Sequence, residues 1–317
     1  MTGRSLWWHA VLLVSGLIYA RFCFGFFPPP SGRLGGDYSY FLPLLLAGRY
    51  WIAANGPLAV PHFTPAFCGG LPFLANPQSI FYSMPQLLGA IVDPERAFFL
   101  TTVLFAWAGG IGMFLLLRQR FRTSPPAAAL GGVVFLFNGF LLYRMAIGHV
   151  PYHAVGLLPL LCWALLTPIG GQANGFYRAC AAIAGAAALL TYFVYGGAPH
   201  LIVPAAIAVI AVWLLLAVVD RPLWSFWPVG LAAGVLAAAA GAAKLAPALA
   251  FVAPFPRSEL WIFPDFGDAA SVLVRGLFLP WTLPAWWGKY ETELGLGPAP
   301  LVLLVFGGCA AIVTVGR

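Results

Sequence analysis

The sequence predicts an all-α polytopic membrane protein of about eight transmembrane helices, with interfacial helices in a long first outer loop. This prediction is based on the composition, because 62% of the 317 residues are hydrophobic and only 8% are charged. An ordinary soluble domain has about 25% charged residues. The mean hydropathy is +0.90, and the apolar residues gather in runs long enough to cross a bilayer. So few charged side chains could not cover the surface of a water-soluble protein of this length.

Eight segments are candidates for the spans, with boundaries that can shift by several residues. They are residues 6–27, 97–117, 126–143, 154–170, 179–196, 199–219, 228–253 and 298–315. At about 1.5 Å per residue, each crosses most or all of a hydrocarbon core of roughly 30 Å, although the third to sixth are short and interrupted by glycine or proline. The first could instead be a cleaved signal peptide, but its apolar run is longer than a signal core and "YARFCFGFF" offers no small-residue cleavage site. We therefore expect a retained span.

The basic residues predict the orientation. A net charge of +7 would suggest nucleic acid for a soluble protein, but in a membrane protein the basic residues mark the cytoplasmic side. If the N-terminus is cytoplasmic, the cytoplasmic loops hold Asp220 and a set of arginines, namely Arg118, Arg120, Arg122, Arg178, Arg221 and Arg317. The other eight acidic residues then lie outside. We expect no nucleic-acid partner and contact with membrane lipids.

Two connections are too long and too polar to be simple turns: residues 28–96 and 254–297, both on the predicted outer side. Residues 38–54 carry apolar and aromatic side chains at helical spacing, which is typical of a helix lying in the interface. A second such helix is expected to begin near Asn76, a good capping residue, with Pro77 in its first turn. No repeat or linker divides the chain, so residues 1–317 form a single transmembrane domain.

Asp37 is the first candidate for chemistry. It follows "GRLGG", in which Gly35 and Gly36 allow unusual backbone geometry, and it precedes the predicted interfacial helix. Its carboxylate could simply cap that helix, which would contribute about 1 kcal/mol. Alternatively it could act at the membrane surface, together with Tyr38 and Tyr40 as substrate-binding residues.

Basic residues near or within the spans are candidates for binding phosphate. Lys244 lies inside the seventh predicted span, where a charged side chain costs roughly 2.5–3.5 kcal/mol unless it is paired, hydrated or snorkelling. Arg21 lies near the outer end of the first span and could snorkel to the interface. Arg257 and Arg275 in the second outer loop could grip phosphate bidentately. For Lys244 the alternative is a structural salt bridge or snorkelling, and for Arg21 it is snorkelling.

Three histidines, His149, His153 and His200, fall on the outer side. They could bind zinc, but Pro151 interrupts any helix that would place the first two on one face, and no cysteine accompanies them. Hydrogen bonding to substrate or to loop carbonyls is the favoured reading.

The outer acids could bind a divalent cation or orient a sugar, and solvated loop charges are the alternative. They include Asp265, Asp268, Glu291 and Glu293. No cofactor is firmly indicated, and a divalent metal ion held by these acids is the one option. A disulfide between Cys23 and Cys68 is a further option. The chain has no Walker loop, dinucleotide fingerprint or nucleophile elbow, which disfavours nucleotide-driven chemistry.

Several stretches carry a resemblance when taken in order: "GDYSYFLPLLLAGRYWIAANGPLAVPHFTPAFCGGLPFLANPQSIFYSMPQLL", "GHVPYHAVGLLPLL", "GGAPHLIVPAAI", "LAPALAFVAPFPRSE" and "YETELGLGPAPLVLL". A first span, an outer loop that begins with an acid, interfacial helices and then a hydrophobic bundle resemble the GT-C glycosyltransferases. More narrowly, the chain is similar to the bacterial YfhO-like membrane proteins.

The resemblance implies an outward-facing enzyme of the bacterial plasma membrane that transfers a sugar from a polyprenyl-phosphate donor to a glycan, lipid or protein acceptor. Asp37 corresponds to the first-loop acid that GT-C enzymes use at the catalytic centre, and direct displacement implies inversion at the sugar. Lys244 departs from the family pattern, which has an uncharged polar residue there, so its phosphate role is a physical prediction. Family members usually continue beyond the eighth span, so acceptor-binding parts are expected in further chain or in a partner.

Two other function classes stay open at this point. A flippase or transporter of lipid-linked glycans should carry polar residues at mid-membrane on several spans, often in repeated halves, whereas these acids crowd into two outer loops. A scaffold for a polysaccharide complex should tolerate loss of Asp37. For the enzyme, we expect Asp37 within about 10 Å of a basic side chain in an outward-opening cavity.

Overall fold

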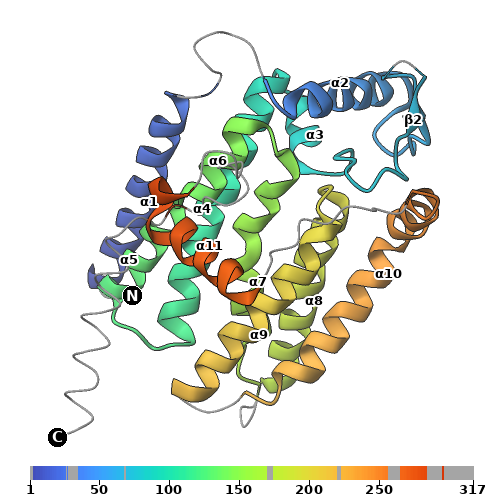
Figure 1. Cartoon of the computed structure of the whole chain (residues 1–317). Helices are drawn as coiled ribbons and strands as arrows, with labels where there is room; N and C mark the ends of the chain where they lie inside the picture. The colour runs from blue at the N-terminus through green and yellow to red at the C-terminus, as the bar shows by residue number, and fades with distance from the viewer. Residues whose placement is uncertain are drawn as a thin grey trace, which may run out of the picture.

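A computed structural model describes residues 3–25, 27, 35–67, 69–169, 174–219, 223–255, 265–283 and 295. The fold is helical (Figure 1). The α-helices are α1 (Gly3–Phe24), α2 (Tyr38–Asn55), α3 (Met84–Gly89), α4 (Pro94–Gln119), α5 (Pro125–Leu136), α6 (Gly139–Ile147), α7 (Leu158–Leu165), α8 (Gly175–Tyr195), α9 (Ile202–Val219), α10 (Phe226–Val252) and α11 (Phe266–Phe278). The 3-10 helices in the described residues are η1 (Val150–Leu157), η2 (Pro199–Leu201) and η3 (Pro280–Thr282). The described strands, β1 (Phe63–Thr64) and β2 (Leu71–Pro72), pair antiparallel.

The described part of the chain contains six helical segments long and apolar enough to cross a membrane, so the protein has the character of a multi-pass membrane protein. They are Trp7–Phe24, Pro94–Gln119, Pro125–Ile147, Gly175–Tyr195, Pro199–Val218 and Phe226–Val252. These correspond to the first, second, third, fifth, sixth and seventh predicted spans. The predicted count of eight is not confirmed.

The fourth predicted span, residues 154–170, has a different structure from the one expected. It consists of η1 followed by α7, and together they form a shorter apolar segment, Val150–Leu165. Pro159 lies in the first turn of α7 and has no amide hydrogen to donate to the preceding turn, which favours a break at this point. The eighth predicted span, residues 298–315, lies outside the described residues.

Close packing through glycine holds the centre of the bundle together. Helix α4 packs against α1, α3, α5, α7 and η1. Gly110 of α4 and Gly132 of α5 face one another, and a Cβ built on Gly132 would lie 2.7 Å from the carbonyl oxygen of Gly110. Small residues let membrane helices approach closely and gain van der Waals contact. The other main contact joins α8 to α10.

Helix α2 runs across the ends of the long helices, at the end of the bundle opposite the N-terminus (Figure 1). Its bounds agree with the predicted interfacial helix to within one residue. One face is buried, through Tyr38, Phe41, Leu44, Leu45 and Gly48. The long buried side chains anchor the head of α2 in the core that contains α4.

The second predicted interfacial helix does not begin at Asn76. That residue opens a turn, in which its side-chain oxygen accepts a hydrogen bond from the amide of Gln78 at 3.0 Å. Asparagine stabilises such turns as well as helix starts, and the two roles look alike in sequence. The helix starts later, after Ser83, with Pro85 in its first turn.

Candidate functional site

The segment before α2 is joined to the end of α6 by a close backbone contact, which we call the α2–α6 joint. The amide of Asp37 donates to the carbonyl oxygen of Ile147 at 2.8 Å. Gly36 has φ +60° and Gly148 has φ +91°, and any other residue would be strained in these conformations. A Cβ on Gly36 would also overlap the carbonyl oxygen of Ile147, and a Cβ on Gly148 would overlap the amide nitrogen of Tyr38. Both glycines are therefore required for the contact.

The joint places the Asp37 carboxylate beside His149. The distance from Asp37 Oδ2 to His149 Nε2 is 3.2 Å, and the side chain of Asp37 is 54% exposed. Asp37 occupies the N-cap position of α2, yet its side chain accepts no capping hydrogen bond. Asp93 behaves differently, because its carboxylate accepts from the amide of Arg96 at the start of α4, at 2.9 Å. In this structure the Asp37 side chain is directed to His149 and not to the helix.

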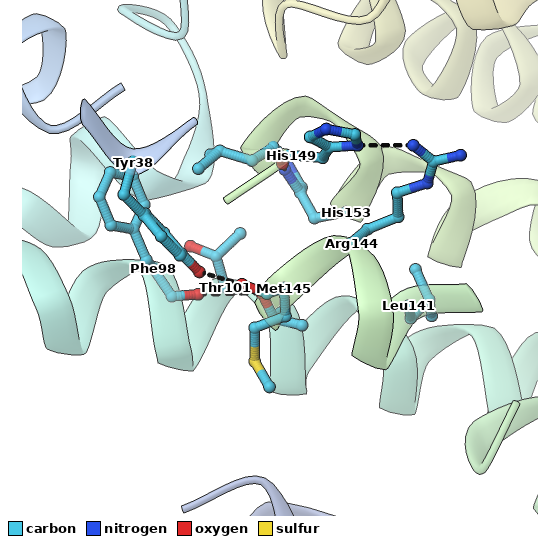
Figure 2. Close-up of a pocket in the computed structure, with 10 residues that line it drawn as sticks. Tyr38, Phe98, Thr101, Leu141, Arg144, Met145, His149 and His153 are labelled. Atoms are coloured by element: carbon cyan, nitrogen blue, oxygen red, sulfur yellow. Dashed lines mark hydrogen bonds between the residues drawn. The ribbon is translucent and has the colours of Figure 1, made fainter. Parts of the chain in front are cut away.

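The protonation of His149 follows from its other neighbour. His149 Nδ1 lies 2.5 Å from Nη1 of Arg144, and Figure 2 shows the two groups pointing toward one another. A guanidinium only donates hydrogen bonds, so Nδ1 must accept this one. In the neutral ring the proton is then on Nε2, which donates to Asp37. His149 thus links a half-exposed carboxylate to a buried cation.

Arg144 is enclosed by aromatic rings. Its side chain is 5% exposed, and its guanidinium carbon lies 4.3 Å from the ring centroid of Tyr152 and 5.1 Å from that of Phe140. Stacking of this kind stabilises a guanidinium by roughly 0.5–2 kcal/mol. Arg144 is not among the residues predicted from the sequence; it directly follows the third predicted span. The feature of the sequence that could have pointed to Arg144 is its position five residues before His149.

A small cavity lies against these groups. It is lined by Tyr38, Arg144, His149 and His153 among others, and its volume is about 10 Å³ (Figure 2). That is close to the minimum for one water molecule. This cavity is too small to hold a sugar.

Tyr38 and Tyr40, both predicted substrate-binding residues, have protein partners. The Tyr38 hydroxyl donates to the carbonyl oxygen of Met145 at 2.6 Å, and the Tyr40 hydroxyl accepts from Nδ2 of Asn76 at 2.5 Å. Burial raises the pKa of both phenols. Each therefore stays protonated at neutral pH, and the first fastens the head of α2 to α6.

The other two predicted histidines have different surroundings. His153 is buried, with Nδ1 2.5 Å from the carbonyl oxygen of Val150 and Nε2 2.7 Å from the hydroxyl of Tyr192. His200 is exposed and packs edge to face on Tyr152, with ring centroids 5.5 Å apart. Through Tyr152, His200 joins the surroundings of Arg144. Within the described ranges, no group of three or more His, Cys, Asp or Glu residues is arranged to hold a metal ion.

Lys244 is placed away from solvent. Its side chain is 2% exposed, and its ammonium donates to the carbonyl oxygen of Ser79 at 2.5 Å and to that of Tyr195 at 3.4 Å. These bonds tie α10 to the turn before α3 and to the end of α8. These hydrogen bonds of Lys244 are thus to backbone carbonyls, which differs from both the salt bridge and the snorkelling considered from the sequence.

The other basic residues predicted to bind phosphate are three arginines. Arg21 is exposed on α1 and forms no hydrogen bond or ion pair with any described residue. Nε of Arg275 donates to the Thr282 hydroxyl at 2.9 Å on the exposed side of α11. Arg257 lies outside the described residues.

Of the predicted outer acids, Asp265 accepts from the amide of Asp268 and caps α11 at 2.9 Å. Glu291 and Glu293 lie outside the described residues. Cys23 is a buried free thiol, and Cys68, its predicted partner, also lies outside them.

Comparison of the chain with protein-family models, with curated proteins and with solved structures finds no significant match.

Proposed function

We propose that this protein is a membrane glycosyltransferase that transfers a sugar from a polyprenyl-phosphate donor to an acceptor on the outer side of the plasma membrane. Asp37 is the general base. Its carboxylate takes the proton of the acceptor hydroxyl while the hydroxyl oxygen bonds to the anomeric carbon. The bond from that carbon to the phosphate oxygen breaks, and the electron pair leaves with the lipid phosphate. The sugar is inverted.

One observation supports this proposal above the others: the Asp37 carboxylate is half exposed and does not cap its helix. A base has to reach substrate and has to be held in one orientation by a further group. Here the Nε2–H group of His149 donates a hydrogen bond to one carboxylate oxygen of Asp37. Nη1 of Arg144 donates in turn to Nδ1 of His149 and orients the ring.

The donor phosphate needs a cation near the outer end of the bundle. Arg21 is the best candidate among the described residues, because it is exposed near the end of α1 that leads to Asp37, and none of its donors is used by a described residue. Arg275 is the second candidate. Lys244 is the weakest, since its ammonium already donates to two carbonyl oxygens.

Reconstitution tests the proposal directly. Proteoliposomes that contain the full chain are supplied with a panel of radiolabelled polyprenyl phosphate sugars and an extract of cell-envelope acceptors, and transferred label is counted. Asp37→Asn keeps the shape of the side chain and cannot take the proton, so transfer should fall by about 10²–10⁴-fold. The matched control is Asp93→Asn, which changes an acid at another helix start.

Normal transfer by Asp37→Asn would remove the proposed base. If wild-type protein transfers label from no donor in the panel, the enzyme class itself fails and transport or scaffolding of lipid-linked glycans is favoured. The control variant should transfer as the wild type does, since the Asp93 carboxylate contacts Arg96 and not the α2–α6 joint.

A further inference from the structure

A second cavity, of about 490 Å³, is formed by the end of α4, by α7 and by α8. Its lining includes the last residues before the turn that joins α4 to α5, and this turn lies at the end of the bundle opposite α2 (Figure 1). Two arginines, Arg120 and Arg178, contribute to its wall, and most of the remaining lining is apolar. We call it the α4–α8 groove. It shares no lining residue with the cavity beside His149.

Arg120 is held rigidly at the wall of the groove. Its side chain is 8% exposed, and its guanidinium lies 5.2 Å from the ring centroid of Trp163. Nε and Nη2 donate to the carbonyl oxygen of Trp163 at 3.1 and 2.9 Å, and Nη2 also donates to the hydroxyl of Thr167 at 2.8 Å. A guanidinium has five N–H groups. The two on Nη1 donate to no residue in the described part of the chain, so they can serve an anion.

Arg178 brings a second positive charge to the same place. Burial, and then the charge of Arg178, lower the pKa of Arg120 to about 10. The guanidinium of Arg120 therefore stays charged at neutral pH, and the guanidinium of Arg178 repels it across the groove. An anion bound between them would relieve this repulsion. The planar guanidinium can donate two parallel hydrogen bonds to the oxygens of a phosphate.

The apolar part of the groove has the length of an acyl chain in one leaflet. Along α8 the lining continues from Arg178 through Ala181 and Gly185 to Ala188. Ten residues of helix rise about 15 Å, which is half of a hydrocarbon core of roughly 30 Å. A Cβ built on Gly185 meets no atom within 4 Å. The small side chains thus leave an open channel that begins at two cations and reaches the middle of the membrane.

We propose that the α4–α8 groove binds an anionic phospholipid, with its phosphate on Arg120 and Arg178 and one acyl chain along Ala181, Gly185 and Ala188. Basic pockets between membrane helices at the cytoplasmic surface suit such headgroups. The charge favours an anionic headgroup over a zwitterionic one. This proposal is independent of the activity of Asp37.

Native mass spectrometry of the full chain tests it, with dioleoyl phosphatidylglycerol, dioleoyl phosphatidylcholine, polyprenyl phosphate and inorganic phosphate as separate probes. Phosphatidylglycerol should bind more tightly than phosphatidylcholine. Arg178→Gln should weaken its binding about fivefold, the effect of one arginine at a membrane surface. Gly185→Leu should weaken it at least as much, because the new side chain fills the channel and leaves both charges in place.

The controls are matched to these variants. Gly230→Leu changes a glycine of α10 that also has open space around it, and Arg49→Gln removes an exposed arginine of α2; both should bind phosphatidylglycerol as the wild type does. Equal binding of the two phospholipids, or unchanged binding by Gly185→Leu, would overturn the proposal. So would displacement of phosphatidylglycerol by equimolar inorganic phosphate, which indicates a free-phosphate site, or a preference for polyprenyl phosphate, which indicates a carrier-lipid site.

Discussion

At the scale of single residues, His149 connects two groups that lie far apart in the sequence. Asp37 and Arg144 carry opposite charges, yet the ring of His149 lies between them and makes one contact to each. The buried guanidinium holds one nitrogen of the ring, and this determines which nitrogen can donate to the carboxylate. Among the contacts of the described residues, Arg144 reaches Asp37 through His149, so it is a positioning residue.

Replacement of Arg144 should separate this role from general stability. Arg144→Met removes the donor to His149 and should lower sugar transfer by roughly 10²-fold, because the carboxylate is no longer held in one orientation. Arg144→Lys keeps a charged donor and should restore part of the transfer. Initial rates in proteoliposomes and the thermal unfolding midpoint are measured for both. If both variants lose transfer only in proportion to folded protein, the role of Arg144 is structural.

At the scale of elements, the two glycines of the α2–α6 joint determine where Asp37 lies. Without this contact, the first residues of α2 would be free to move relative to α6. The backbone bond from Asp37 to Ile147, with the Tyr38 hydroxyl bonded to Met145, fixes that residue on α6.

The joint can be tested by substitution of Gly36. Gly36→Ala places a Cβ at positive φ and against the carbonyl oxygen of Ile147, so it should destabilise the protein by more than the roughly 1–3 kcal/mol of backbone strain alone. Gly56→Ala is the matched control, because Gly56 has φ +84° with no atom within 4 Å. Unfolding in denaturant is followed for both. Equal destabilisation by the two variants would contradict a close contact at the joint.

Lys244 gives a second prediction at this scale. Lys244→Met keeps the length of the side chain and removes the donor to Ser79 and Tyr195, so the free energy of unfolding should fall by about 1–3 kcal/mol. Sugar transfer per folded molecule should not change. Leu245→Met, on the same turn of α10, is the control for the new side chain. Loss of transfer without loss of stability would instead support the phosphate-binding role predicted from the sequence.

At the scale of the whole molecule, the two candidate sites lie at opposite ends of the bundle. Helix α2 is at one end, and the turn between α4 and α5 is at the other (Figure 1). Asp37 precedes α2 directly, and the α4–α8 groove is lined by the residues next to that turn. The arginines near that turn predict that its end faces the cytoplasm.

Cysteine labelling tests this orientation. In a background without native cysteines, Leu58→Cys, at a position 92% exposed beyond α2, should react with a membrane-impermeant maleimide added to intact cells. Ser124→Cys, in the turn between α4 and α5, should react only after the membrane is opened. The reverse pattern would show that the N-terminus and the groove face outward, and would place Asp37 in the cytoplasm.

The long apolar helices and α2 were predicted well, because their signals are local. Apolar runs of membrane length and the period of α2 are read from neighbouring residues, and the observed bounds of α2 differ from the prediction by one residue. Predictions were wrong where the same residue type can serve in two different local structures. Asn76 opens a turn and not a helix, and η1 with α7 forms a broken segment instead of a full span.

The sequence by itself determined that this is a helical membrane protein and that Asp37 stands at the head of a helix, since composition and periodicity follow from the order of residues along the chain. The tertiary structure alone decided what Asp37 contacts. His149 lies more than a hundred residues further along, and it reaches Asp37 only because two glycines let separate backbone segments meet. Contacts of this kind depend on how helices far apart in the sequence pack together, so they cannot be predicted from a local sequence pattern.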